Sequence, residues 1–111
     1  MTHRYCLTLD LKDDPELIAE YRRLHEAIWP EVAQSLKDAG IEDAEIYQLG
    51  TRMFMVLEVN NGFSWDAKIK ADLANPKVRE WEEFMWKFQK PLPQAKPGEK
   101  WLAMERIFKL K

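Results

Sequence analysis

The sequence of 111 residues is poor in the residues from which several common kinds of site are built. It has a single cysteine, Cys6, so no disulfide can form within the chain. Its four glycines lie at expected turns, which excludes a glycine-rich phosphate-binding loop. No group of histidine, cysteine and carboxylate residues has the spacing of metal ligands, so we expect no metal site.

Charge and hydropathy exclude further partners. The net charge is only −2, and acidic and basic residues are interspersed without the basic cluster that nucleic-acid binding requires. No apolar run approaches the roughly 20 residues that cross a bilayer, and no apolar signal-peptide core precedes the first expected strand. We therefore expect a cytoplasmic protein with one free thiol that binds neither nucleic acid nor membrane.

The expected elements follow the order β-α-β-β-α-β. Alternating apolar and polar residues predict the strands, and Asp14-Pro15 and Asn75-Pro76 are typical starts of helices. Pro30 and Pro76 should each divide a helical unit in two, because a residue before proline is pushed out of the helical region. The predicted elements are a strand over 4–11, helices over 15–28 and 30–37, strands over 41–49 and 53–59, helices over 64–73 and 76–88, and a strand over 101–108.

This order predicts one domain over residues 1–111 in the α+β class, with a ferredoxin-like fold. Its antiparallel four-stranded sheet should carry helices on one face only. The third and last strands are nevertheless apolar on both faces, as the run Met53-Phe54-Met55-Val56-Leu57 shows. A second apolar face of this kind is expected to be buried against a partner. We expect a homodimer that packs sheet against sheet as a dimeric α+β barrel.

The candidate site is the stretch of residues 21–30, which contains His25, the only histidine away from the N-terminus. At about 100° per residue, Tyr21 and His25 lie one turn apart on the apolar face of a helix. Histidine has the unperturbed pKa nearest neutrality, so His25 is a candidate general acid and base, with Tyr21 as its neighbour in the site. The same pattern also fits a core histidine whose two ring nitrogens are satisfied.

Five tryptophans are more than a small core needs, and flat aromatic faces recur in ligand pockets. The polar groups of such a pocket would be Tyr21, His25 and Tyr47, and its candidate walls are Trp29, Trp81, Trp86 and Trp101. Such a pocket suits proton transfer on a small neutral ligand with an apolar face. Burial in the core or in a dimer interface is the other explanation for each tryptophan.

These residues resemble the L-rhamnose mutarotase family, and most of all its branch of L-fucose mutarotase-like proteins. The resemblance runs from about residue 5 to 108 and implies a ferredoxin-like fold, dimerisation through the sheets, no metal and no cofactor. It implies interconversion of the α and β anomers of a 6-deoxy-L-sugar, with His25 as proton donor and with Tyr21 and Trp81 in contact with the sugar. The motifs that carry it are Tyr21-x-x-x-His25-x-x-Ile28-Trp29-Pro30-Glu31, Ile46-Tyr47, and Trp81 followed by Met85.

Two positions depart from the pattern of the rhamnose enzymes, in which a sugar-binding tyrosine and a second tryptophan stand where this chain has Ala44 and Glu82. A carboxylate can accept hydrogen bonds from sugar hydroxyls, so Glu82 suits a sugar with different hydroxyl stereochemistry. We expect L-fucose as the substrate, with L-rhamnose as the alternative. Glu82 could equally be solvated surface.

Two other functions fit the same fold. A cofactor-free oxygenase of the dimeric α+β barrel type also places a histidine in its cleft, and a ferredoxin-like ligand-sensing module needs no catalytic group. Fold alone does not separate these from a mutarotase. Binding of a free 6-deoxy sugar, as against a polycyclic aromatic compound, would do so.

Overall fold

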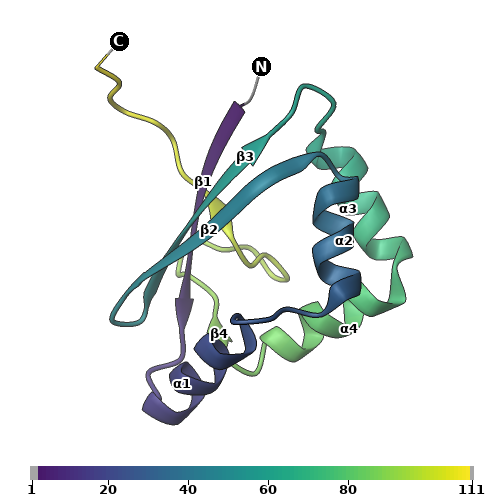
Figure 1. Cartoon of the computed structure of the whole chain (residues 1–111). Coiled ribbons are helices and arrows are strands. Elements are labelled where there is room, and N and C mark those ends of the chain that lie inside the picture. Colours follow the sequence, from purple (N-terminus) through teal and green to yellow (C-terminus); the bar gives the residue numbers. More distant parts are fainter. Residues whose placement is uncertain (1–2, 111) are drawn as a thin grey trace.

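Five antiparallel strands form one sheet in the computed structural model, which describes residues 3–110 (Figure 1). The sheet order is β2-β3-β1-β4, and the short β5 also pairs with β1. Two short strands, β4 and β5, pair with β1 where the sequence predicted one fourth strand. The predicted ferredoxin-like order is confirmed. The elements are β1 (His3–Leu11), α1 (Pro15–Leu24), α2 (Pro30–Asp38), β2 (Ile41–Leu49), β3 (Arg52–Val59), α3 (Trp65–Ala74), α4 (Pro76–Met85), β4 (Gln89–Lys90) and β5 (Leu102–Ala103).

The helices begin at the capping residues and prolines from which the sequence predicted their starts. The Asp14 carboxylate accepts hydrogen bonds from the first amides of α1, at 3.0 and 3.2 Å. Asn75 ends α3 and its side-chain oxygen accepts from the first amides of α4, at 3.1 and 3.4 Å. Pro15, Pro30 and Pro76 each occupy the first turn of a helix, where a missing amide hydrogen costs nothing. Capping residues and prolines therefore divide the first helical unit into α1 and α2 and the second into α3 and α4.

Helix α1 is shorter than predicted, because it ends at Leu24 and His25 is its C-cap. The amide of Glu26 bonds to the carbonyl of Arg23, three residues back, so the last turn tightens instead of continuing. Residues 26–29 then form a connection before Pro30. His25 consequently lies at the end of the helix and not in its middle, which frees its ring to face the neighbouring helices.

The register of the strands separates the two faces of the sheet. Leu9 lies opposite Met53, and both are buried against the helices. The intervening residues of β1 and β3, such as Thr8 opposite Phe54, point to the face that carries no helix. The core on the helical face joins the sheet to α1, α2 and α4 through Leu9, Leu11, Tyr21, Val32, Met53, Trp81, Met85 and Phe88.

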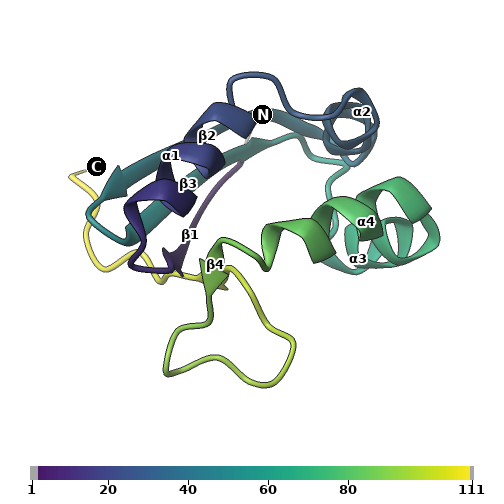
Figure 2. The same cartoon turned by 90° about the horizontal axis from the view of Figure 1, so that it is seen from below.

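The predicted last strand over 101–108 is wrong in its extent. Only Leu102–Ala103 pairs with β1, and one more bond follows from the Met104 amide to the Cys6 carbonyl. After residue 104 the chain leaves the edge of β1 and runs clear of the helices (Figures 1 and 2). Its apolar side chains stay largely exposed, and Ile107 and Phe108 are 94% and 75% exposed.

The helix-free face of the sheet is hollowed beneath this C-terminal segment. The hollow has a volume of about 1020 Å³, and its lining includes Cys6, Phe54, Met104 and Phe108. Residues 3–110 contain no helix that is both long and apolar enough to span a membrane.

Candidate active site

The aromatic cluster around His25 lies on the helical face of the sheet. The imidazole packs against the Tyr21 ring at a tilt of 31°, with 4.2 Å between ring centroids, and meets Trp81 edge-on at 5.6 Å. Trp29 packs against Trp81 at 5.1 Å. The structure thus brings together four of the six residues that the sequence predicted for the site, and they come from α1, the connection after it, and α4.

One hydrogen bond sets the protonation state of His25. Its Nδ1 lies 2.8 Å from the main-chain carbonyl oxygen of Tyr21. A carbonyl oxygen only accepts, so Nδ1 carries the hydrogen and Nε2 of the neutral ring holds a lone pair. Burial lowers the pKa of His25 from its ordinary value of 6.5, and the bond to the Tyr21 carbonyl opposes that shift. At neutral pH the ring is therefore an uncharged base at Nε2.

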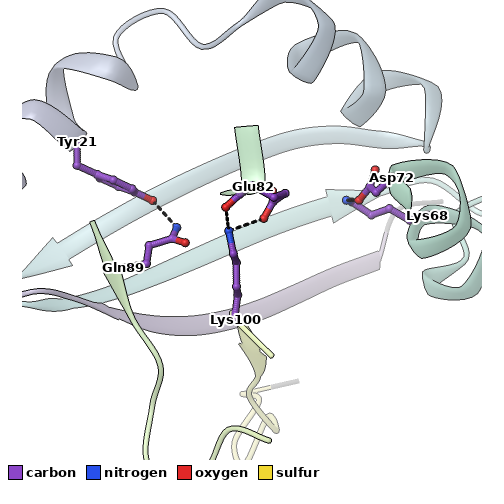
Figure 3. Close-up of polar contacts among 6 residues, drawn as sticks. All are labelled: Tyr21, Lys68, Asp72, Glu82, Gln89 and Lys100. Atoms are coloured by element: carbon purple, nitrogen blue, oxygen red, sulfur yellow. Dashed lines mark hydrogen bonds and ion pairs between the residues drawn. The ribbon is translucent and has the colours of Figure 1, made fainter. Parts of the chain in front are cut away.

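Tyr21 is buried and keeps its proton. Its hydroxyl oxygen accepts a hydrogen bond of 3.3 Å from Nε2 of Gln89, the first residue of β4 (Figure 3). Burial raises the pKa of Tyr21 to about 12, the bond from Gln89 lowers it, and the negative charge of Glu82 raises it. A base at His25 and a protonated phenol at Tyr21 thus stand side by side.

Glu82 lies beside this pair but is engaged by a lysine. Nζ of Lys100 donates to the main-chain carbonyl of Glu82 and lies 2.9 Å from its carboxylate (Figure 3). The same Nζ lies over the ring of Trp86, at 4.7 Å from the centroid. Lys100 therefore ties the end of the long 91–101 connection to α4. Because the Glu82 charge also acts on the Tyr21 phenol, its role at the site remains a prediction.

Tyr47 lies apart from this cluster within one chain, and its part in sugar binding stays a prediction. It pairs with Phe54 across β2 and β3, and Phe54 faces the helix-free side with Thr8. Strand residues alternate between faces, so Tyr47 lies on the opposite side of the sheet from His25. The sequence contained the alternation but not the face on which the helices lie.

The neighbouring residues of β2 lie on the helical face of the sheet but are not covered. Ala44, Ile46 and Gln48 pair with Leu57, Met55 and Met53 on the helical face. All three are nevertheless exposed, and Ile46 is 39% exposed. The helices therefore do not cover this edge of the sheet. Ala44, which the family pattern placed in the pocket, lies on the correct face for that role.

Sequence reasoning missed Gln89. It follows the apolar stripe of α4 directly, but a glutamine after a helix carries no chemical signal of its own. Its importance depends on its register opposite Leu11 in β1, which turns it into the core beside Tyr21.

Residues 4–110 match the family model described as L-rhamnose mutarotase. The chain is 46% identical to the L-fucose mutarotase of Xanthomonas campestris pv. campestris, over 96% of this chain and 87% of that protein. It is 34% identical to the L-rhamnose mutarotase of Acidiphilium cryptum, over 87% of this chain and 89% of that protein. The chain belongs to the L-rhamnose mutarotase family. The crystal structure of an L-rhamnose mutarotase from Formosa agariphila has the same fold, with a TM-score of 0.70 at 21% identity over 98% of this chain and 99% of that one.

Membership of this mutarotase family makes the protein an isomerase that acts on sugars. It also decides among the functions that the sequence left open. The family match covers the residues of the aromatic cluster, so the cluster belongs to a mutarotase and not to an oxygenase or a sensing module. The resemblance drawn from the motifs around His25 is confirmed.

The lowered pKa of His25 has a consequence for stability that can be measured. Between the lowered pKa of the folded protein and the ordinary value near 6.5, the unfolded chain binds more protons, so acidification favours unfolding. We expect the urea midpoint of the wild type to fall as the pH is lowered from 7.5 through 6.5 to 5. His25→Asn should fall less steeply, because asparagine does not titrate. Parallel curves for the two proteins would contradict the assignment.

Proposed function

We propose that this protein interconverts the anomers of L-fucose, with His25 and Tyr21 as the two proton carriers. The observation that carries the proposal is the bond from His25 Nδ1–H to the Tyr21 carbonyl, which leaves Nε2 as a base next to a protonated phenol. Opening a pyranose ring needs one group of each kind: a base for the anomeric hydroxyl and an acid for the ring oxygen.

The reaction runs through the open-chain sugar. His25 Nε2 takes the proton of the anomeric hydroxyl, the bond from C1 to the ring oxygen breaks, and the Tyr21 hydroxyl protonates that oxygen. Rotation about the C1–C2 bond turns the other face of the aldehyde toward the ring hydroxyl. Closure reverses both transfers, so histidine then acts as the donor that the family resemblance implies. Both side chains end in their starting states, and no cofactor enters the balance.

The rest of the cluster suits a deoxy sugar. Trp29 and Trp81 offer aromatic faces for the methyl group and the apolar face of the pyranose. L-fucose is the first choice because the relative with 46% identity is an L-fucose mutarotase, and because Ala44 and Glu82 depart from the rhamnose pattern. L-rhamnose is the second choice, since other relatives are L-rhamnose mutarotases.

The role of His25 is tested by removing its titrating group. His25→Asn retains a side-chain N–H for the Tyr21 carbonyl but cannot carry a proton, so anomer exchange should slow by roughly 10² or more. Saturation-transfer NMR on L-fucose measures the exchange directly, after circular dichroism has confirmed the fold. His3→Asn is the matched control and should exchange at the wild-type rate. Equal rates in all three proteins would make His25 a core residue.

Sugar choice is tested on two substrates. We expect faster anomer exchange on L-fucose than on L-rhamnose in the same NMR measurement. Glu82→Gln should lower the rate on L-fucose, because it removes the charge and weakens acceptance of sugar hydroxyls. Glu83→Gln, the same change one residue along α4, should have no effect. An unchanged rate for Glu82→Gln would limit Glu82 to its ion pair with Lys100.

We also propose that the protein is a cytoplasmic homodimer that packs through the helix-free face of the sheet. The hollow on that face, which is lined by charged and apolar side chains together, and the exposed Ile107 and Phe108 of the C-terminal segment support this proposal. A second copy would cover the hollow and give the C-terminal segment a surface to pack on. The interface should be of the obligate size, above roughly 2,000 Å² in total.

A charge on the helix-free face should disrupt this dimer. Phe54→Glu introduces a carboxylate into the hollow, so we expect the variant to dissociate or to unfold. Ala71→Glu, on the exposed side of α3, is the control and should remain dimeric. Sedimentation at micromolar concentration distinguishes the states. A wild-type protein that sediments as a stable monomer would refute the dimer.

A further inference from the structure

Gln89 is an unexpected residue at its position. It lies opposite Leu11 in the register of β4 and β1, on the helical face of the sheet. It is 3% exposed, and it is the one polar side chain among the buried residues of the described part of the chain. Its neighbours in sequence and register, Phe88 and Leu11, belong to the apolar core. Stability alone favours an apolar residue here.

The two ends of the Gln89 amide differ in what they contact. The nitrogen donates to the Tyr21 hydroxyl oxygen, whereas Oε1 is buried without a hydrogen-bond partner among the described residues. In the opposite orientation Oε1 would accept from the phenol, and both N–H groups of the buried amide would be left unpaired instead of one oxygen. An unpaired buried oxygen weakens the fold. The contact with Tyr21 therefore explains why a glutamine occupies this buried position although its Oε1 is unpaired.

That contact fixes the direction of the phenol proton. An amide N–H cannot accept a hydrogen bond, so the Tyr21 O–H cannot point at Gln89 and must donate elsewhere. The His25 ring lies against the Tyr21 ring, with 4.2 Å between centroids, so a sugar bound to His25 would lie within reach of that proton. Gln89 also opposes the effects of burial and of Glu82 on the pKa of Tyr21, which makes the phenol a better proton donor.

We propose that Gln89 is a positioning residue for anomer exchange, which aims the Tyr21 proton at the ring oxygen of the sugar by donating to the Tyr21 hydroxyl oxygen. The inference rests on the proposed function. It deepens that function by adding a residue that acts through Tyr21 and does not touch the sugar.

Gln89→Met tests this role, because methionine has nearly the same shape without the donor and without the unpaired oxygen. We expect kcat for L-fucose exchange to fall by roughly tenfold, KM to stay unchanged, and the urea midpoint to stay unchanged or to rise. Gln94→Met makes the same chemical change on the exposed 91–101 connection and should behave as the wild type. Should Gln89→Met fail to fold, Gln89→Leu takes its place.

A double-mutant cycle with Tyr21→Phe separates positioning from direct sugar contact. If Gln89 acts through the phenol, Gln89→Met has no further effect in the Tyr21→Phe background. Additive losses, a raised KM, or a wild-type kcat for Gln89→Met would each overturn the inference. The rate of the wild type separates failure of this inference from failure of the proposed function. If the wild type accelerates anomer exchange and Gln89→Met does so equally, only this inference is overturned. If the wild type does not accelerate anomer exchange, the proposed function is overturned as well.

Discussion

The hydrogen bond from His25 Nδ1 to the Tyr21 carbonyl is the contact on which the chemistry of the site depends. The bond forms at the C-cap of α1, where the Tyr21 carbonyl accepts both the main-chain amide of His25 and its Nδ1–H. It selects one tautomer and turns Nε2 away from the helix. The main chain thus determines which ring nitrogen carries the hydrogen, and this choice does not rely on a second ionisable side chain.

The candidate site lies against the hydrophobic core. Tyr21, Trp81 and Phe88 are buried with the strand residues beneath them, so the packing that stabilises the fold also positions the proposed proton carriers. Burial lowers the pKa of His25 and raises that of Tyr21, which moves them in the directions that keep one neutral base and one neutral acid. An unpaired buried polar atom such as Oε1 of Gln89 costs about 1–3 kcal/mol, a cost that the surrounding apolar packing offsets.

The two faces of the sheet have separate roles that follow from strand alternation. The helical face carries the candidate site, and its edge at β2 is not covered by the helices. The helix-free face carries the hollow and the exposed C-terminal segment. A shift of one position in register would move the Tyr47 side chain to the other face of the sheet, because neighbouring strand residues point in opposite directions.

The sequence by itself determined the features that depend on short spacings. Asp14, Asn75 and the prolines set where the helices start, and the interval of four residues brings Tyr21 to His25 because one helical turn spans that interval. Only the tertiary structure decided which face holds Tyr47, that Glu82 pairs with Lys100, and that the chain leaves β1 after Met104. Gln89 reaches Tyr21 across 68 residues. Such contacts depend on strand register and on the packing of distant elements, whereas caps and helical turns depend on the covalent geometry of a few neighbouring residues.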